Sequence, residues 1–450
     1  MQYGGIVVCT TDRGGAPSDA DAQLPSATGP DVPAEAPLTP PHAKRWLMLA
    51  LGTAAQTSAC AFVYAIPSLA DELRSAEHLT LTQVGLLAAC PTAGLVLALI
   101  AWGAAADRWG ERVVISSGLG LAAVLLGVAT TIGPMTAFGL VLALAGAASA
   151  SVYSASGRLV MGWFGTGERG LAMGIRQTST PLGMAMAALT MPPIAAAYGV
   201  RGAIAFLAVV CGVIAVLIAV FAADPARAAR SAGTAVRTAN PYRGSRVLWR
   251  IHGSGALLVV PQFTAGAFAL VLLVDARGWS PVAAGQLVAL GQGLGAVSRI
   301  VVGRWSDRVG SRMRPMRQLA LITAAVIGAT ALTAAFPSPL TDVALVLAIG
   351  ITASTNGLSF TATAEGAGPA WSGRALGIHN TGQNLTAALV PPVIGALITD
   401  AGYWPGFAVA GAAACVAAVL VPSRDPVAGE ADLSTADTTA FAGAGEPSQR

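Results

Sequence analysis

Charged side chains are scarce along the whole of this 450-residue chain. Only 11% of the residues are charged, against roughly 25% in an ordinary soluble domain. By contrast, 54% are hydrophobic, and the mean hydropathy is +0.65. Apolar runs of about 20 residues, the length that a helix needs to cross a bilayer, recur between residues 46 and 421. These proportions exclude a water-soluble protein and predict a multi-pass protein embedded in the lipid bilayer.

Lysine is almost absent, since Lys44 is the only one among 26 basic residues. A phosphate-binding Walker A loop needs a lysine after a glycine-rich turn, and no such turn precedes Lys44. ATP hydrolysis and an intramembrane Schiff base therefore have no residue to carry them. The chain also lacks HExxH, CxxC and clustered histidines, so we expect no enzyme, no cofactor and no metal site. The five cysteines are scattered, which is typical of small core residues.

Acidic residues are concentrated at the two ends of the chain. Residues 1–42 and 423–450 hold ten acids and three bases, which leaves 23 bases and 12 acids between them. The first of these segments lacks both apolar periodicity and the basic-then-apolar order of a signal peptide. We therefore predict two disordered cytoplasmic tails. The basic excess falls between hydrophobic segments on one side of the bilayer, so we expect no nucleic-acid partner.

Apolar runs predict an all-α integral membrane protein with twelve transmembrane helices. A basic cytoplasmic linker at 223–248 separates two bundles of six helices, at 43–222 and 249–422. Pro225 and Pro241 in this linker oppose a continuous helix. The predicted spans are 46–70, 83–105, 112–132, 136–161, 170–196, 202–222, 249–275, 281–303, 316–335, 339–364, 373–399 and 403–421.

Arginine is distributed unevenly among the connections between these spans. The connections after even-numbered spans are rich in arginine, whereas those after odd-numbered spans hold only Arg74, Arg201 and Arg277. Cytoplasmic loops of membrane proteins carry the excess of basic residues. The asymmetry predicts that the linker and both termini lie in the cytoplasm and that the protein lies in the cell membrane.

A ten-residue motif occurs twice, 200 residues apart. Its five matched positions are Gly103, Asp107, Arg108, Gly110 and Arg112 in one copy and Gly303, Asp307, Arg308, Gly310 and Arg312 in the other. A second set, 203 residues apart, pairs Gly170, Gly174 and Thr178 with Gly373, Gly377 and Thr381. In each copy of the motif the first glycine allows close backbone approach, and the aspartate can bind helix N-terminal amides or an arginine across the loop. Two ordered sets indicate a duplicated six-helix unit.

With this motif the chain resembles the major facilitator superfamily of secondary transporters, whose loop between the second and third helices has the form G-x-x-x-D-R-x-G-x-R. The resemblance covers residues 43–422 in span count, loop lengths and central linker. It implies two pseudo-symmetric six-helix bundles and a central cavity that opens alternately to each side. It also implies a cytoplasmic conformational latch formed by the two copies of the motif. We expect a monomer.

The chain departs from the proton-coupled drug exporters of that family at two points. Those exporters carry an arginine within the fourth span, but here Arg158 comes only at its cytoplasmic end. In the fifth span they carry G-P-x-x-G-G, of which only Pro181 and Gly183 remain. Export of neutral or cationic drugs or metabolites is therefore the alternative function and not the leading one.

Few charged groups lie at bilayer depth, where each costs roughly 2.5 to 3.5 kcal/mol on insertion scales. Arg176 lies inside the fifth span, and His379 is its repeat partner in the eleventh. Helical spacing places Thr180 on the face of Arg176 and Gln383 on the face of His379. An arginine opposite a histidine and amides suits a small anion, because the guanidinium offers a fork to carboxylates and similar oxyanions. The alternative for Arg176 is a side chain that snorkels to the interface.

Further polar side chains lie in the first, fourth, seventh and tenth spans, which line the cavity in the family that the chain resembles. The candidates for substrate binding among them are Tyr64, Tyr153, Gln262 and Asn356. Arg299 and Glu365 lie near the predicted cytoplasmic face and are interpreted as gate residues, with Glu365 paired to Arg304, Arg308 or Arg374. His252 is interpreted as a histidine that is satisfied at the interface.

Together these patterns predict a secondary transporter that moves a small organic or inorganic anion by alternating access. Proton coupling is expected, with the proton and a small-molecule solute as the partners. A membrane-embedded enzyme is disfavoured because no catalytic motif is present. The identity of the solute and the direction of transport are left open at this point.

Overall fold

The computed structural model describes residues 42–75, 77–225, 240–243, 246–336 and 338–426. Most of the two tails and of the linker lie outside these described residues. Within them, every regular element is a helix. By length and composition, eleven described helical stretches are long and apolar enough to cross a membrane.

The first half of the chain contributes six spans, and helix α7 includes parts of the last two. Its long helices are α1 (His42–Val63), α3 (Leu81–Trp109), α4 (Glu111–Ala129), α5 (Met135–Met161), α6 (Arg169–Gln177) and α7 (Ser179–Phe221). Two short helices, η1 (Ile66–Leu69) and α2 (Ala70–Ser75), connect α1 to α3. The predicted first span, 46–70, therefore ends early as a regular α-helix.

The stretch from α6 through α7 holds two spans. It is 53 residues long, or about 80 Å at 1.5 Å per residue, against a hydrocarbon thickness of roughly 30 Å. Gly199 interrupts the helical geometry with φ 71° and ψ 173°, a conformation that glycine adopts readily. The chain reverses there, between the predicted fifth and sixth spans, so the eleven stretches hold twelve spans.

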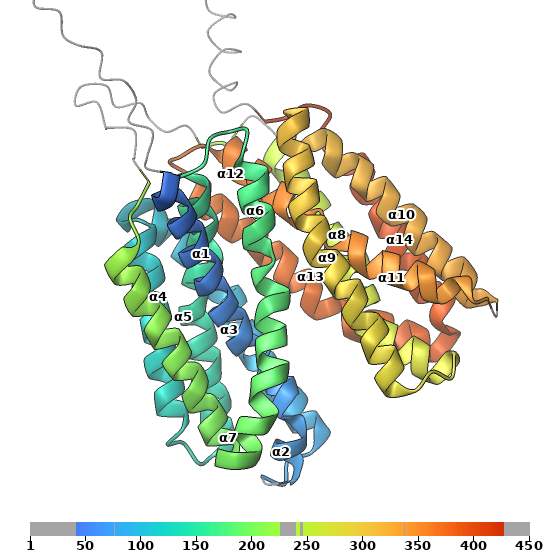
Figure 1. Ribbon diagram of the computed structural model, residues 1–450, viewed down its shortest axis with the longest axis horizontal. Helices are drawn as coiled ribbons and strands as arrows, with labels where there is room; N and C mark the ends of the chain where they lie inside the picture. The colour runs from blue at the N-terminus through green and yellow to red at the C-terminus, as the bar shows by residue number, and fades with distance from the viewer. Residues whose placement is uncertain (1–41, 76, 226–239, 244–245, 337, 427–450) are drawn as a thin grey trace, which may run out of the picture. The chain divides into compact units, whose positions relative to one another are not determined.

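The second half repeats this arrangement with two irregularities (Figure 1). Its helices are α8 (Val247–Val271), η2 (Leu272–Ala276), α9 (Pro281–Val309), α10 (Met313–Ala335), α11 (Leu340–Thr352), α12 (Asn356–Ala367), α13 (Ser372–Ala401) and α14 (Tyr403–Leu420). The π-helical turn η2 extends the seventh span. The tenth span is broken between α11 and α12, which frees backbone carbonyl groups at bilayer depth.

The repeated motif lies at the ends of α3 and α9. Both helices run past the predicted ends at 105 and 303, so Asp107 and Asp307 lie in the last helical turn and not in the loop. The second glycine of each copy lies where the chain turns after the helix, since Gly110 and Gly310 have positive φ values of 95° and 66°. We call this end of the helices the linker end, since α8 begins there after the linker.

Small residues allow the helices to pack closely. Within the first half, a side chain at Gly94 or Gly146 would collide with the backbone of the facing helix, so glycine permits α3 and α5 to touch. At the linker end, glycines likewise allow the two halves to pack in close contact. Gly103 on α3 faces the backbone of Gly373 on α13, and Gly170 faces that of Gly303.

Candidate functional site

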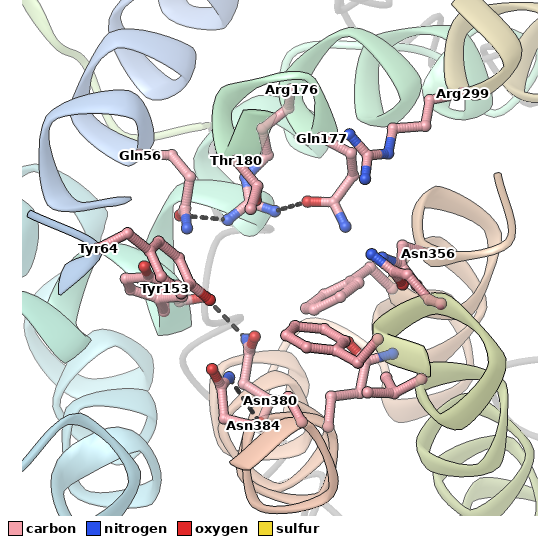
Figure 2. Close-up of a pocket in the computed structure, with 16 residues that line it drawn as sticks. Gln56, Tyr64, Tyr153, Arg176, Gln177, Thr180, Arg299, Asn356, Asn380 and Asn384 are labelled. Carbon is pink, nitrogen blue, oxygen red and sulfur yellow. Dashed lines mark hydrogen bonds between the residues drawn. The ribbon is translucent and has the colours of Figure 1, made fainter. Parts of the chain in front are cut away.

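A cavity of about 80 Å³ lies between the two halves. Helices α1, α5, α6 and α7 form one wall, and α8, α9, α12 and α13 form the other (Figure 2). Seven of the eight predicted substrate-binding residues line it: Tyr64, Tyr153, Arg176, Thr180, Gln262, Asn356 and Gln383. No carboxylate is present among the described residues that line this cavity.

Arg176 occupies the last turn of α6 and is only 2% exposed. Its Nη2 donates to Gln56 Oε1 at 2.8 Å and to Ser156 Oγ at 2.7 Å, and its Nη1 donates to Gln177 Oε1 at 2.9 Å. The guanidinium also lies 5.8 Å from the centre of the Phe360 ring. All of these partners are neutral, so Arg176 is buried with its positive charge uncompensated by any described carboxylate.

Arg299 is a second buried guanidinium at the same cavity. It lies on α9, is 5% exposed, and donates from Nε to the carbonyl oxygen of Ala353 at 3.2 Å. That carbonyl is available because the tenth span is broken between α11 and α12. In the described part of the chain, no acidic side chain pairs with Arg299 either. The predicted gate residue therefore lines the cavity, on the same edge of it as Arg176 and Gln177 in Figure 2 but from the other half of the chain.

His379, by contrast, does not line the cavity, although it is the repeat partner of Arg176. It is 1% exposed and lies edge-on to the Phe360 ring, with centroids 4.9 Å apart. Its Nδ1 lies 3.1 Å from Nδ1 of His252, and its Nε2 lies 3.0 Å from Ser359 Oγ. The stripe of α13 that faces the cavity is rotated by one position from the predicted one and consists of Asn380, Gln383, Asn384 and Ala387.

Several polar residues of the cavity bind each other across helices. Asn356 donates to Gln262 Oε1 at 3.1 Å, and Asn380 donates to the Tyr153 carbonyl oxygen at 2.9 Å. The Asn380 bond joins the two halves directly. Amides three and four residues apart on the apolar helix α13 are the signal that would have identified Asn380 and Asn384 beside Gln383.

The first copy of the repeated motif binds the other half of the molecule through Asp107. Its carboxylate accepts hydrogen bonds from the backbone N–H groups of Gly373 and Arg374, at 2.8 and 3.1 Å. Arg158 of α5 donates to Asp107 at 2.6 Å and also pairs with Glu111. Asp107 thus has both kinds of partner that the sequence predicts, a helix N-terminus and an arginine. Its arginines are Arg158 of α5 and, at 3.7 Å, Arg374 of α13, and neither belongs to the motif.

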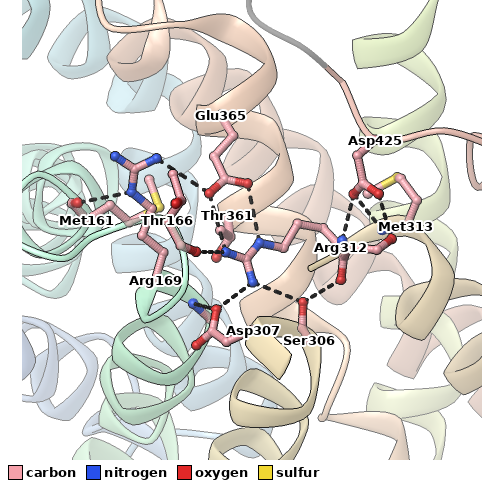
Figure 3. A network of polar contacts seen from close by, with 12 residues as sticks. Met161, Thr166, Arg169, Ser306, Asp307, Arg312, Met313, Thr361, Glu365 and Asp425 are labelled. Carbon is pink, nitrogen blue, oxygen red and sulfur yellow. Dashed lines mark hydrogen bonds and ion pairs between the residues drawn. The ribbon is translucent and has the colours of Figure 1, made fainter. Parts of the chain in front are cut away.

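The second copy makes corresponding contacts through Asp307 and Arg312 (Figure 3). Asp307 accepts from the N–H groups of Gly170 and Leu171 at the start of α6, at 2.9 and 2.8 Å. Arg312 bridges Asp307 at 2.6 Å and Glu365 at 3.3 Å. Burial alone would lower the pKa of Arg312, but the carboxylates of Glu365 and Asp307 outweigh it and raise that pKa above its usual value.

The predicted gate residue Glu365 and the remaining motif arginines also have identifiable surroundings. Glu365 pairs with Arg169 and Arg312, at 3.5 and 3.3 Å, and not with the three arginines proposed for it. Arg112 donates to the carbonyl oxygen of Ala219 at the end of α7, where a cation is favourable. Arg108 and Arg308 are exposed.

An Asp-Pro pair after each half was missed by the sequence analysis. Asp224 accepts from the backbone N–H of Arg112 at 2.7 Å, and Asp425 accepts from those of Arg312 and Met313 at 2.6 and 3.0 Å. The two aspartates are 201 residues apart and each precedes a proline. Their spacing close to 200 would have revealed them as part of the duplication.

Comparison with known proteins identifies relatives over most of the chain. The family model described as Major Facilitator Superfamily matches residues 47–391. Uncharacterized MFS-type transporters from two strains of Mycobacterium tuberculosis, H37Rv and CDC 1551, are each 44% identical over 383 residues. These matches cover 84% of this chain and 85% of each relative.

Solved structures with the same fold include proteins of different substrate classes. The fucose:proton symporter FucP of E. coli has a TM-score of 0.67 at 16% identity, covering 84% of this chain and 98% of FucP. The proton:xylose symporter XylE has a TM-score of 0.69 at 15% identity, covering 84% and 96%. The human organic anion transporter MFSD10 has a TM-score of 0.64 at 17% identity, covering 85% and 100%.

Proposed function

The chain belongs to the major facilitator superfamily of transporters, and on this premise we propose that it carries a small anion through the cell membrane by alternating access, coupled to a proton. The observation that supports an anion is the pair of buried guanidiniums, Arg176 and Arg299, at a cavity lined by no described carboxylate. The fold itself favours no substrate class, because its relatives include sugar symporters and an organic anion transporter.

When the cavity is empty, the two buried guanidiniums are electrostatically unfavourable. A buried charge without a partner is unfavourable, and an opposite charge held by good hydrogen bonds offsets that cost. Arg176 and Arg299 approach the cavity from opposite halves, α6 and α9. An anion between them would bind both guanidiniums and so hold the two halves together. Alternating access requires this coupling between substrate binding and closure.

The size of the cavity favours a small solute. Its volume of about 80 Å³ is well below the roughly 300 to 1,000 Å³ of pockets that hold drug-sized ligands. A carboxylate or oxyanion of a few non-hydrogen atoms fits this space. Guanidinium forks and amides such as Asn356 and Asn384 are suitable donors for its oxygens.

The contacts at the linker end support a role for the two motif copies as the conformational latch. Asp107 binds the first residues of α13, and Asp307 binds the first residues of α6. Each aspartate thus joins one half to the other. With the linker end in the cytoplasm, as the arginine asymmetry predicts, these bonds close the cytoplasmic side, and breaking them would open it.

The sidedness is tested by cysteine labelling. On a background without native cysteines, Arg243→Cys and Glu77→Cys place single thiols at exposed positions on opposite sides of the proposed topology. An impermeant thiol reagent should label position 77 in intact cells and position 243 only after permeabilisation. The reverse pattern would invert the assignment of cytoplasmic and external faces.

The substrate class is tested with purified protein. We would measure thermal stabilisation by nitrate, formate, pyruvate and phosphate, with choline and glucose as cationic and neutral comparisons, and then uptake into proteoliposomes of the anions that stabilise. Parent protein and Arg201→Gln, which changes an exposed arginine outside the cavity, should respond to anions, whereas Arg176→Ala should not. Equal responses of Arg176→Ala and parent to every anion would refute the anion proposal.

The alternative, export of neutral or cationic compounds, is favoured by one feature of the same cavity. Four aromatic side chains line it, Tyr64, Tyr153, Phe263 and Phe360, and aromatic faces bind apolar and cationic ligands. In the same panel, stabilisation by organic cations that persists in Arg176→Ala would select this alternative.

A further inference from the structure

Two histidines lie in contact behind the cavity wall. Nδ1 of His252 on α8 lies 3.1 Å from Nδ1 of His379 on α13. At the other side of the pair, His252 Nε2 lies 3.0 Å from the hydroxyl of Tyr242 in the described part of the linker. We infer that His252 and His379 together form the binding site of the coupling proton, which enters from the linker end through Tyr242. This inference rests on the proposed transport of an anion.

With the His379 hydrogen on Nε2 and the Gln383 amide turned so that its oxygen faces that nitrogen, the hydrogen bonds form one continuous chain. Ser359 donates its hydroxyl hydrogen to the Asn356 carbonyl oxygen at 2.9 Å, so its oxygen accepts from His379 Nε2–H at 3.0 Å. His379 Nδ1 is then unprotonated and accepts from His252 Nδ1–H. His252 Nε2 in turn accepts from Tyr242, and burial raises the pKa of Tyr242 to about 12, so this hydroxyl keeps its hydrogen.

This chain defines how one proton enters. Water at the linker end gives a proton to the Tyr242 oxygen as the original hydroxyl hydrogen passes to His252 Nε2. The added charge can move to His379 when the hydrogen on His252 Nδ1 crosses to the facing Nδ1. The net result is one imidazolium shared by two rings. A second proton is excluded, because two positive rings in contact would repel each other in a buried site.

The pair lies next to the anion site without being part of it. The Phe360 ring separates His379 from Arg176, with centroid distances of 4.9 Å to the imidazole and 5.8 Å to the guanidinium. The Gln383 amide, which lines the cavity, lies 3.2 Å from His379 Nε2. A positive charge on the pair is disfavoured by Arg176 when the cavity is empty and favoured when an anion is bound there. Binding of anion and proton is therefore mutually reinforcing.

Other groups in the described spans do not offer this chemistry. None of the described carboxylates lines the cavity, and the cysteine and tyrosines around it are protonated near neutral pH in their ordinary state. Histidine is the side chain whose ordinary pKa lies in that range. The charged groups on the elements that surround the pair are Arg250 on α8, Arg169 and Arg176 on α6, Glu365 on α12, and Arg374 and Asp400 on α13. Of these, Glu365 is paired with Arg169 and Arg312, and Arg250 donates to carbonyl groups at the end of α14.

The first test measures the pair directly. The chain has four histidines, so ¹⁵N-histidine labelling in lipid nanodiscs gives a spectrum that His42→Gln and His78→Gln simplify without touching the pair. We expect the ring nitrogens of His252 and His379 to titrate together, as one shared event, and to shift toward higher pH when nitrate or pyruvate is added. Two independent titrations, or two rings that stay neutral from pH 5 to 8 with and without anion, would overturn the inference.

The second test measures proton uptake on anion binding. Nitrate or pyruvate is added to detergent-solubilised protein in weakly buffered solution near pH 7, with a pH indicator present. The parent, His42→Gln and His78→Gln should each take up about one proton per bound anion. His252→Gln and His379→Gln should take up none, while still binding the anion at high pH, which shows that they are folded.

The two proposals fail in different ways. Anion binding without proton uptake in the parent would refute the histidine site and leave anion transport standing. Absence of any anion binding would refute the proposed function, and the histidine titration would still decide whether the pair holds one shared proton. Tyr242→Phe distinguishes entry of the proton from its binding by the histidines, because the variant keeps the aromatic ring and both histidines but lacks the hydroxyl. It should slow proton uptake without changing its final extent; an unchanged rate would remove Tyr242 from the path.

Discussion

The two halves of this transporter build the same arrangement of charges at the linker end from differently placed residues. In the first half, the motif supplies two carboxylates, Asp107 and Glu111, and the neighbouring helix α5 supplies the arginine between them. In the second half, the motif supplies the arginine, Arg312, and α12 supplies the second carboxylate. The order carboxylate, arginine, carboxylate is the same in both. The comparison teaches that the electrostatic arrangement was retained after duplication while the positions that carry it were exchanged.

A second contrast between the halves concerns the cavity. Arg176 and His379 are repeat partners, yet Arg176 reaches the cavity and His379 is enclosed behind Phe360. On the proposals made above, the two repeat partners serve different ligands, the anion at Arg176 and the proton at His379. The following predictions test both contrasts.

The largest effect is expected from Arg158→Ala. This change leaves Glu111, whose side chain is 2% exposed, as a buried carboxylate without its arginine, and leaves Asp107, 4% exposed, with only the longer contact to Arg374 at 3.7 Å. Removing one partner of a buried ion pair costs about 3 to 5 kcal/mol. We expect that loss in the free energy of unfolding, measured by denaturant titration in detergent, with partial rescue by Glu111→Gln.

Arg312→Ala sharpens the same comparison. Its effect should be smaller, because Glu365 is 21% exposed and keeps a second partner in Arg169. Arg112→Ala is the matched control, since the Arg112 side chain is exposed and, among the described residues, donates only to the Ala219 carbonyl. An equal loss for Arg112→Ala and Arg158→Ala would show that the motif acts through general charge and not through these pairs.

The next effect is expected at the cavity. Arg176→Ala should weaken anion binding by about 2 to 5 kcal/mol, or roughly 30-fold to several-thousand-fold at 1.4 kcal/mol per decade. Arg176→Lys should recover only part of this, because an ammonium lacks the bidentate fork. Titration calorimetry at a pH above 8 measures it, with His379→Gln as the matched change in the other half. Near-parent affinity for His379→Gln and loss for Arg176→Ala would establish the division of tasks, whereas equal losses would contradict it.

A smaller effect on affinity, but a clear one on conformation, is expected from Asp107→Asn and Asp307→Asn. Each change weakens two hydrogen bonds from backbone N–H groups of the other half, and bonds to a charged group contribute about 1.5 to 3 kcal/mol. The linker end should open more often, as seen by distance measurements between spin labels on α3 and α13. Loss of anion affinity without altered opening would contradict the latch assignment.

The smallest effect is expected from the Asp-Pro pairs. Asp425 accepts two backbone N–H bonds and a hydroxyl bond from Ser311, while Asp224 accepts one described backbone bond. Loss of such a cap costs about 0.5 to 2 kcal/mol. In thermal unfolding, Asp425→Asn should therefore have a lower melting temperature than Asp224→Asn. The opposite ranking would show that the count of capping bonds does not govern this end of the molecule.

Much of the architecture follows from the sequence alone. Twelve apolar runs, a duplicated motif and an arginine-rich linker predict two six-helix halves, because hydrophobic length and repeat spacing are properties of the chain itself. Seven of eight residues chosen for the cavity line it. Polar residues in otherwise apolar helices are expensive unless they face a polar space or a partner, so their presence already restricts where they point.

The partners of these residues required the tertiary structure. Nothing in the spacing of Asp107 indicates that its arginine is Arg158 of another helix, 51 positions away. The rotation of α13 by one position, which encloses His379 against His252, arises from packing against α8 and α12 and not from its own period. Sequence determines which faces of a helix are apolar, but when lipid and protein neighbours are equally apolar, only close packing between helices decides which residues meet.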